Sequence, residues 1–341
     1  IKFDGTISAF GFAAFNECKT LKNIKYPTSI STIGGHAFHN CHKLESIVIS
    51  DSITRIEESA FATCANLKSV YIDNITQWCN IQFGNGSANP ISYNPARLYV
   101  NGELFDETTL VIPDSVTSIP DWAFLMLDIT SVTIPNSVTS IGKGAFSQCY
   151  YLLDVTIPDS VITIGDWAFD HCDSLVSIDI PYGIMKISDS MFSGCSCLEN
   201  VIIPNSVTEI CANAFSDCIS LKSIILPNVI TRIGSLAFYN CENLTSIEIP
   251  DNVESIGNNA FEGCTGLMSI TIPDTHISSE AFMYCRNLQK LILSGTRPII
   301  GTKAFYGCEN LTEITICENI FNVYIDEQAF SMTDLNTFAF S

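Results

Sequence analysis

Three histidines and a cysteine within seven residues are the first group in this sequence that could carry out chemistry. The stretch "IGGHAFHNCHKL", residues 33–44, contains His36, His39, Cys41 and His42. Imidazole nitrogens and a thiolate are ligands that zinc prefers. Histidines spaced three residues apart would also partly converge on one face of a helix. Taken alone, the stretch indicates a metal site. Whether the four side chains can converge on one ion depends on the secondary-structure elements that carry them.

The stretch is one copy of a repeat that runs through the chain, and internal repeats decide a fold before local motifs do. A phenylalanine, usually preceded by alanine, recurs mostly every 23 residues, and a cysteine usually follows it by three. Eleven of the fifteen cysteines occupy this position, Cys41 among them. The three histidines fall where other copies vary, which favours an incidental surface cluster over a metal site. The recurring phenylalanines are Phe15, Phe38, Phe61, Phe124, Phe146, Phe169, Phe192, Phe215, Phe238, Phe261, Phe282, Phe305 and Phe330.

Each copy reads approximately L-x-x-I-x-I-P-[DN]-S-V-x-x-I-G-x-x-A-F-x-x-C. The L-x-x-I-x-I part alternates apolar and polar residues, which predicts a short half-buried strand that the proline ends. The spacing from the glycine to the next leucine predicts one or two short helical or 3₁₀ turns. No single copy can bury its own apolar residues, so copies must stack, with strands about 4.8 Å apart in a parallel sheet. The sequence therefore predicts a solenoid with columns of Phe and Cys inside it.

The cysteine column admits two interpretations. Stacked cysteines about 5 Å apart are within reach of a disulfide. Parallel side chains that all point inward do not present the torsion of roughly 90° that the bond needs, and buried cysteine packs well as a small hydrophobe. We expect free buried thiols in the column.

The repeat is interrupted once, at residues 73–112. Asn101-Gly102 between apolar residues predicts a two-residue β-hairpin. The segment is either an enlarged copy that projects a loop for binding, or a variant copy with a purely structural role. Its aromatic residues include three binding candidates, Trp78, Tyr93 and Tyr99.

Composition and missing motifs exclude several classes of function. The formal charge is −20, and such a field repels a polyanion, so we expect no nucleic-acid partner. No apolar run is long enough to span a membrane. His171 and His276 have no nucleophile motif near them, and no phosphate-binding or dinucleotide-binding glycine pattern occurs. We therefore expect no enzymatic activity and no cofactor.

The outward strand positions are the remaining candidate for function. They are mostly uncharged, and two apolar runs stand out. Either the β-propensity of Val, Ile and Tyr explains these runs, or exposed apolar residues mark a partner-binding site. The candidate residues are Val48, Tyr71 and Val111 in one run, and Ile202 and Ile225 in the other.

The I-x-I-P, I-G-x-x-A-F and C-x-x-L blocks resemble those of BspA-like leucine-rich repeat proteins over nearly the whole chain. The resemblance implies an α/β repeat solenoid over residues 1–341, with the enlarged repeat at 73–112. It would be a right-handed horseshoe with a concave parallel β-sheet and short helical, 3₁₀ or irregular convex segments. The resemblance also implies a secreted or cell-surface bacterial protein that acts in adhesion.

On this basis we expect a monomer that binds a protein or glycan on its concave face. A structural spacer within a larger surface protein is the alternative, and a metal-dependent enzyme is a remote one.

Overall fold

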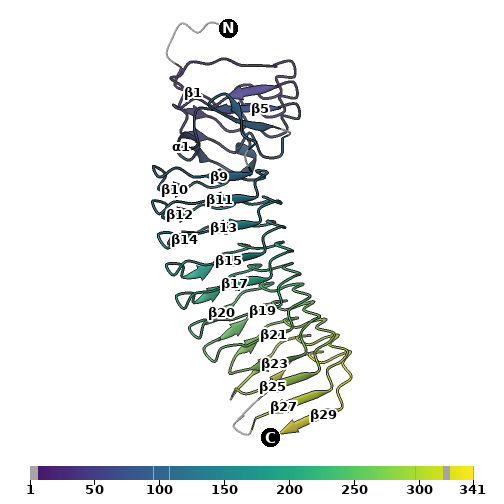
Figure 1. Ribbon diagram of the computed structural model, residues 1–341. Helices are drawn as coiled ribbons and strands as arrows, with labels where there is room; N and C mark the ends of the chain where they lie inside the picture. The colour runs from purple at the N-terminus through teal and green to yellow at the C-terminus, as the bar shows by residue number, and fades with distance from the viewer. Residues whose placement is uncertain (1–6, 95, 107, 296, 318–322, 341) are drawn as a thin grey trace. The chain divides into compact units, whose positions relative to one another are not determined.

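The computed structural model describes residues 7–94, 96–106, 108–295, 297–317 and 323–340. The chain divides into two compact units, Ile1–Tyr150 (unit 1) and Tyr151–Ser341 (unit 2). Each unit is a stack of coils joined by parallel strands, so the parallel β-solenoid expected from the repeat is confirmed within both (Figure 1). That the two units form one continuous solenoid over residues 1–341 stays a prediction.

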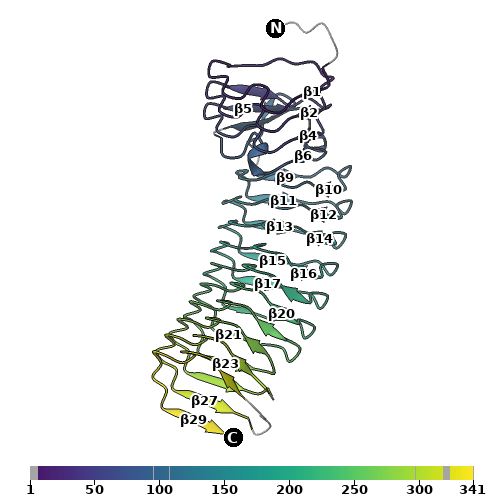
Figure 2. The same ribbon diagram turned by 180° about the vertical axis from the view of Figure 1, so that it is seen from behind.

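Every regular coil has three sides, which we name the long-strand row, the short-strand row and the turn row. The I-x-I residues form the long-strand row, and the residues around Ile-Gly form a short-strand row of two-residue strands. The A-F-x-x-C residues form the turn row. The alternation in the repeat predicted the first row, whereas no strand was predicted for the second. Figure 2 shows the short strands from the opposite side.

In unit 1 the long-strand row begins with one four-stranded sheet and continues in a separate parallel pair. The four-stranded sheet contains β3 (Ser46–Val48), β5 (Ser69–Ile72), β7 (Arg97–Val100) and β8 (Glu103–Leu104), and the pair contains β9 (Thr109–Val111) and β11 (Ser131–Thr133). The short-strand row contains β1 (Ala9–Phe10), β2 (Thr32–Ile33), β4 (Arg55–Ile56) and β6 (Gln82–Phe83), and then β10 (Ser118–Ile119) and β12 (Ser140–Ile141).

In unit 2 seven strands of the short-strand row, β16 to β28, form one sheet. The short strands of this unit are β14 (Thr163–Ile164), β16 (Lys186–Ile187), β18 (Glu209–Ile210), β20 (Arg232–Ile233), β22 (Ser255–Ile256), β24 (His276–Ile277), β26 (Ile299–Ile300) and β28 (Tyr324–Ile325). The long strands are β13 (Asp154–Thr156), β15 (Ser177–Asp179), β17 (Asn200–Ile202), β19 (Ser223–Ile224), β21 (Ser246–Ile247), β23 (Ser269–Ile272), β25 (Lys290–Leu293), β27 (Glu313–Ile316) and β29 (Thr337–Phe340).

The turn row contains irregular turns instead of helix. Among the described residues the helical elements are α1 (Ile75–Trp78) and the 3₁₀ turn η1 (Gly86–Ala88), both inside the interruption of the repeat. In the regular coils, His36 and Asn40 have positive φ angles of 55° and 58°. This backbone directs alternate N–H groups to the next coil, as from Phe38 N to Ala60 O at 2.8 Å. The expected helical turns are therefore absent there, because these hydrogen bonds run between coils, and the irregular alternative is correct.

The core is built from the columns that the repeat predicted. Phe38 and Phe61 stack with ring centroids 5.3 Å apart and planes 9° from parallel, and both are fully buried. Unit 2 repeats this stack from Phe169 to Phe330. The glycine of the Ile-Gly pair is required by close approach of neighbouring coils, since a Cβ on Gly34 would lie 2.6 Å from the carbonyl oxygen of Phe10.

Candidate partner-binding surface on the long strands

Four residues on the outward face of unit 1 lie side by side across the long-strand row. Register places Val48 beside Tyr71, Tyr71 beside Tyr99 and Tyr99 opposite Leu104. We call Val48, Tyr71, Tyr99 and Leu104 the aromatic strip. They alternate with buried Ile47, Val70 and Leu98, as the period of a strand requires.

The two tyrosines form the centre of the strip. Their ring centroids are 4.6 Å apart and their planes are tilted by 31°, within the range of favourable aromatic pairs. Val48 is 53% exposed, while both tyrosines and Leu104 are half-buried. The strip is therefore an accessible apolar surface whose rings are already ordered by each other and by hydrogen-bonded strands.

The interruption of the repeat separates Val111 from the run in which the sequence placed it. The chain turns back at Asn101-Gly102, whose φ angles are 52° and 82°, and β8 pairs antiparallel with β7. The hairpin predicted from this dipeptide is present. The residue beside Tyr71 is Tyr99, because β7 pairs with β5. The other edge of β7 is covered by β8, and the strand of Val111 pairs with β11 instead. The expected run Val48–Tyr71–Val111 is wrong in that order.

Val111 instead lines a cavity beside the hairpin. The cavity has a volume of about 500 Å³, and its lining contains two acidic residues, Glu103 and Asp106. The other lining residues are Ile75, Val100, Leu104, Phe105 and Val111. Leu104, Glu103 and Asp106 were missed as candidates. A two-residue turn at Asn101-Gly102 places residues 99 and 104 opposite each other, so the signal for Leu104 was present in the sequence.

Trp78, also a sequence candidate, is fully buried and cannot meet a partner in this fold. Its indole Nε1 donates to the carbonyl oxygen of Ala123 at 2.8 Å, and the amide of Asn89 donates to the same oxygen at 3.0 Å. In regular coils of this unit, the carbonyl oxygen of the alanine in the Ala-Phe pair accepts a hydrogen bond from the phenylalanine N–H of the preceding coil, as Ala60 O accepts from Phe38 N. The enlarged repeat has no such phenylalanine, so two side chains satisfy the buried carbonyl instead. Residue 78 is a structural anchor.

Tyr93 lies away from the strip. It is 58% exposed, and its ring is close to Gly86 and near Trp122 of the turn row. Of the three aromatic candidates in the enlarged repeat, only Tyr99 belongs to the outward strand face.

The second apolar run lies in unit 2 and has acidic neighbours. Ile202 and Ile225 are 62% and 85% exposed. Ile202 pairs in register with Asp179, and Ile225 shares a cavity of about 510 Å³ with Glu248 on the next coil. The two isoleucines occupy the same position in consecutive coils, and carboxylate residues, Asp179 and Glu248, occupy that position in the coils on either side.

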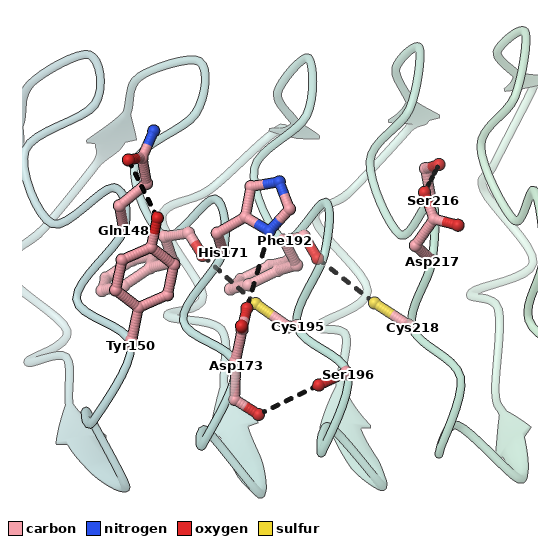
Figure 3. Close-up of polar contacts among 11 residues, drawn as sticks. Gln148, Tyr150, His171, Asp173, Phe192, Cys195, Ser196, Ser216, Asp217 and Cys218 are labelled. Carbon is pink, nitrogen blue, oxygen red and sulfur yellow. Dashed lines mark hydrogen bonds and ion pairs between the residues drawn. The ribbon is translucent and has the colours of Figure 1, made fainter.

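The cysteine column consists of free thiols, as expected. The sulfur of Cys218 donates to the carbonyl oxygen of Phe192 at 3.2 Å, and that of Cys195 donates to Phe169 at 3.1 Å (Figure 3). Burial raises the pKa of the Cys149 thiol to about 12, and that of Cys64 to about 12. Protonated thiols bonded to carbonyls are poor nucleophiles, because the thiolate is the reactive form.

Figure 3 also shows His171 and Asp173, a histidine and a carboxylate that contact each other. The imidazole Nδ1 lies 3.5 Å from the carboxylate, and both side chains are about half exposed. The Cys195 sulfur bonds a carbonyl and not this imidazole. The arrangement is an ion pair when His171 is protonated and lacks an activated nucleophile.

The histidines of the opening stretch are held by neighbours in unit 1. The rings of His36 and His39 meet edge to face with centroids 5.2 Å apart. His39 Nδ1 is hydrogen-bonded to the Asn16 amide oxygen at 3.1 Å, while His42 is exposed. Over the described ranges, no group of three or more His, Cys, Asp or Glu residues is placed to hold a metal ion.

Comparison with known proteins places these observations in a family. The model for BspA-type leucine-rich repeat regions matches residues 1–111, 117–245 and 231–341. No curated protein matches the chain in sequence. Within the described part of the chain, no helix is long and apolar enough to cross a membrane.

Solved structures of bacterial leucine-rich repeat proteins resemble the chain. One from Bacteroides ovatus is 27% identical with a TM-score of 0.62, covering 98% of this chain and 87% of that one. One from Eubacterium ventriosum is 21% identical with a TM-score of 0.56, covering 75% and 80% of the two chains. A leucine-rich cell surface protein from Faecalibacterium prausnitzii is 26% identical with a TM-score of 0.39, covering 100% and 89%.

Proposed function

The chain belongs to the BspA-type leucine-rich repeat family, and from this premise we propose that it is a non-enzymatic binding module of the bacterial cell surface or its surroundings. Its partner is a protein that docks on the outward face of the long strands in unit 1. The family resemblance supports the location, and the aromatic strip supports the choice of docking face.

The observation that carries this proposal is the pair of tyrosines beside the hairpin cavity. Partner contacts that contribute most to binding are enriched in tyrosine and tryptophan and lie next to pockets that exclude water. Tyr71 and Tyr99 are half-buried, in mutual contact and fixed by strands on both sides. A preformed surface of this kind loses little conformational entropy when a partner binds. The adjacent cavity of about 500 Å³ offers a recess for a side chain of the partner.

A binding screen against purified extracellular matrix proteins tests the proposal. Any partner captured by the full chain is titrated against the double variant Tyr71→Ala/Tyr99→Ala. Truncation of two central rings costs about 2 kcal/mol or more, so we expect affinity to fall at least about 30-fold. Tyr93→Ala is the matched control, because it removes an exposed ring from the same enlarged repeat but not from the strip.

Unchanged affinity of the double variant for every captured partner would contradict the assignment of the aromatic strip as the docking face. Capture of no partner at all, with circular dichroism showing a folded chain, would favour the role of a spacer. The variants Ile202→Ser and Ile225→Ser test the second run, and we expect them to leave the affinity within about two-fold because their neighbours are carboxylates.

A further inference from the structure

The charge of the chain is distributed unevenly. Residues 1–100 contain eight Lys and Arg against seven Asp and Glu, whereas residues 101–341 contain eight against 29. The total of −20 therefore comes from the later residues. The net charge of the whole chain does not set the electrostatic potential at the first coils of unit 1, because screening limits the reach of exposed charges to about 8–10 Å.

Four lysines of these first coils line one groove. Lys19, Lys22, Lys43 and Lys68 are all exposed, and they lie where each coil passes from the turn row to the long-strand row. We name them the basic corner. The groove has a volume of about 270 Å³, and its other lining residues are Thr20, Glu45 and Asn66.

Backbone hydrogen bonds hold the corner in register across three coils. Glu45 N donates to Lys22 O at 2.8 Å, and Lys68 N donates to Glu45 O at 2.9 Å. Lys22, Glu45 and Lys68 thus occupy one column, with a rise of about 4.8 Å from coil to coil. The column alternates a positive, a negative and a positive side chain.

The lysines are only weakly neutralised. Lys19 lies 3.8 Å from Glu17 and Lys22 lies 3.6 Å from Glu45, and these lysines are 70% and 66% exposed. Exposed pairs at such distances are weak. Within the described part of the chain, neither Lys43 nor Lys68 has a carboxylate within 4.0 Å.

The corresponding corner of unit 2 contains paired charges and apolar residues instead of a cluster of lysines. Lys222 there pairs with Glu199 at 2.9 Å, and Arg286 pairs with Glu309 at 3.7 Å. The same corner also holds Leu153 and Val176, both exposed. A concentration of lysines facing one groove is therefore a property of the first coils and not of the repeat.

The groove suits one class of anion better than others. Its lining contains no aromatic ring, whereas proteins that bind single-stranded nucleic acids stack bases on aromatic side chains. Glu45 would repel a polymer that presents a phosphate at every step, but its carboxylate accepts hydrogen bonds from hydroxyl groups. Thr20 and Asn66 add polar groups that suit sugar hydroxyls. The lining thus complements a chain that carries both anionic groups and hydroxyls.

We propose that the basic corner binds a linear sulfated glycan, whose sulfates contact Lys19, Lys22, Lys43 and Lys68 and whose hydroxyls contact Glu45. The groove crosses three coils, about 10 Å, and is open, which fits a chain lying across it rather than an enclosed small molecule. This site is independent of the aromatic strip, so either can fail without the other.

Heparin, as a sulfated glycan, is titrated into the full chain and compared with chemically desulfated heparin and a single-stranded DNA oligonucleotide of similar charge. The test variant is Lys43→Glu/Lys68→Glu. Lys186→Glu/Arg297→Glu is the matched control, because it reverses two exposed cationic side chains of unit 2 and changes the total charge equally. Like Lys43 and Lys68, neither residue has a carboxylate within 4.0 Å among the residues that the structure describes. Far-UV circular dichroism verifies folding of each variant.

We expect heparin to bind with an affinity that falls steeply as salt rises, since contacts to a polyanion release counterions. The test variant loses about ten-fold or more in affinity and shows a shallower salt dependence, while the control stays within about three-fold of the parent. Desulfated heparin binds at least about ten-fold more weakly. Glu45→Gln reduces the ratio of heparin affinity to oligonucleotide affinity, because the carboxylate that repels a regular polyphosphate is removed.

Three results would overturn the proposal. Equal losses in the test and control variants would show that only total charge matters. Equal binding of desulfated heparin would remove the role of the sulfates. Binding of the oligonucleotide without binding of heparin would assign the corner to another class of polymer.

Discussion

Replacement of Trp78 tests how the enlarged repeat is joined to the next coil. The indole is fully buried, and it donates one of two side-chain hydrogen bonds to the Ala123 carbonyl. Trp78→Ala removes a large buried side chain, which typically costs about 3–5 kcal/mol of unfolding free energy. Trp78→Phe keeps most of the volume and removes the donor. Because Asn89 still satisfies the carbonyl, this change costs about 1 kcal/mol for the hydrogen bond plus a smaller packing loss.

The two donors are coupled, and the coupling can be measured. Removing either one leaves the Ala123 oxygen with a partner, whereas Trp78→Phe/Asn89→Ala leaves a buried acceptor without either side-chain donor. An unsatisfied buried acceptor costs about 1–3 kcal/mol, so the double variant is destabilised by more than the sum of the single variants.

Urea unfolding followed by far-UV circular dichroism is the assay, since it does not rely on the fluorescence of the residue being replaced. Long repeat arrays need not unfold in a single step, so hydrogen exchange of the amides near Ala123 supplies a local measure. We expect Trp78→Ala to lower the urea midpoint by about 1 M or more. Tyr93→Ala, an exposed ring in the same repeat, serves as the control and changes the free energy by at most about 0.5 kcal/mol.

Equal stability of Trp78→Ala and Tyr93→Ala would refute the anchoring role of Trp78. Strict additivity of the double variant would show that Trp78 and Asn89 do not share the Ala123 carbonyl.

Three further outcomes are expected from the packing and the charges. Under native conditions the exposed Cys197 reacts with iodoacetamide, whereas buried column thiols such as Cys149 react only after unfolding, because burial raises the pKa of Cys149 to about 12. Peptide mass spectrometry locates the label, and rapid labelling of Cys149 in the folded protein would contradict a buried column. Gly142→Ala destabilises unit 1 by roughly 1–3 kcal/mol, since the new Cβ would clash with the Asp121 backbone nitrogen. At Gly11 a new Cβ meets nothing within 4 Å, so Gly11→Ala is close to neutral. Thermal unfolding compares the two variants, and equal melting temperatures would count against the close contact between coils. A hydrogen bond from the Lys290 ammonium, 2.6 Å away, lowers the pKa of Glu313. The pair therefore stabilises the fold at pH values above the ordinary pKa of glutamate, about 4.3, and this contribution is lost as pH falls through the lower pKa of the folded state. The Tm difference between the parent and Lys290→Met shrinks on acidification, and a difference that grows instead would overturn the assignment.

Much of each coil could be predicted from residue spacing. Phe38, Cys41 and Leu44 are buried as the repeat required, and the alternation in Ser46–Val48 gives the expected strand with Ile47 inward. These features depend on residues a few positions apart in the chain, so their pattern is visible in one copy and reinforced by every other. The helical turns were wrong because spacing records which residues are buried and not where backbone N–H groups find acceptors.

Placement of the candidate surface depended on contacts that spacing does not record. Tyr71 was assigned to the outward face from the sequence. Tyr99 became the neighbour of Tyr71, and Leu104 the neighbour of Tyr99, only through the pairing of β5, β7 and β8. Trp78 has the composition of a binding residue, and only its hydrogen bond to Ala123 and its burial show that it is structural.

The sequence by itself determined the repeating coil, the inward columns and the outward strand positions, because a solenoid stacks identical local patterns and each coil contacts its neighbours. The tertiary structure decided which outward residues share a surface, because where one coil is enlarged the register follows hydrogen bonding and not residue number. It also decided that four lysines from three coils face one groove in a chain of net charge −20. Net charge sums over all residues, whereas recognition depends on the charges that lie within a screening length of one another.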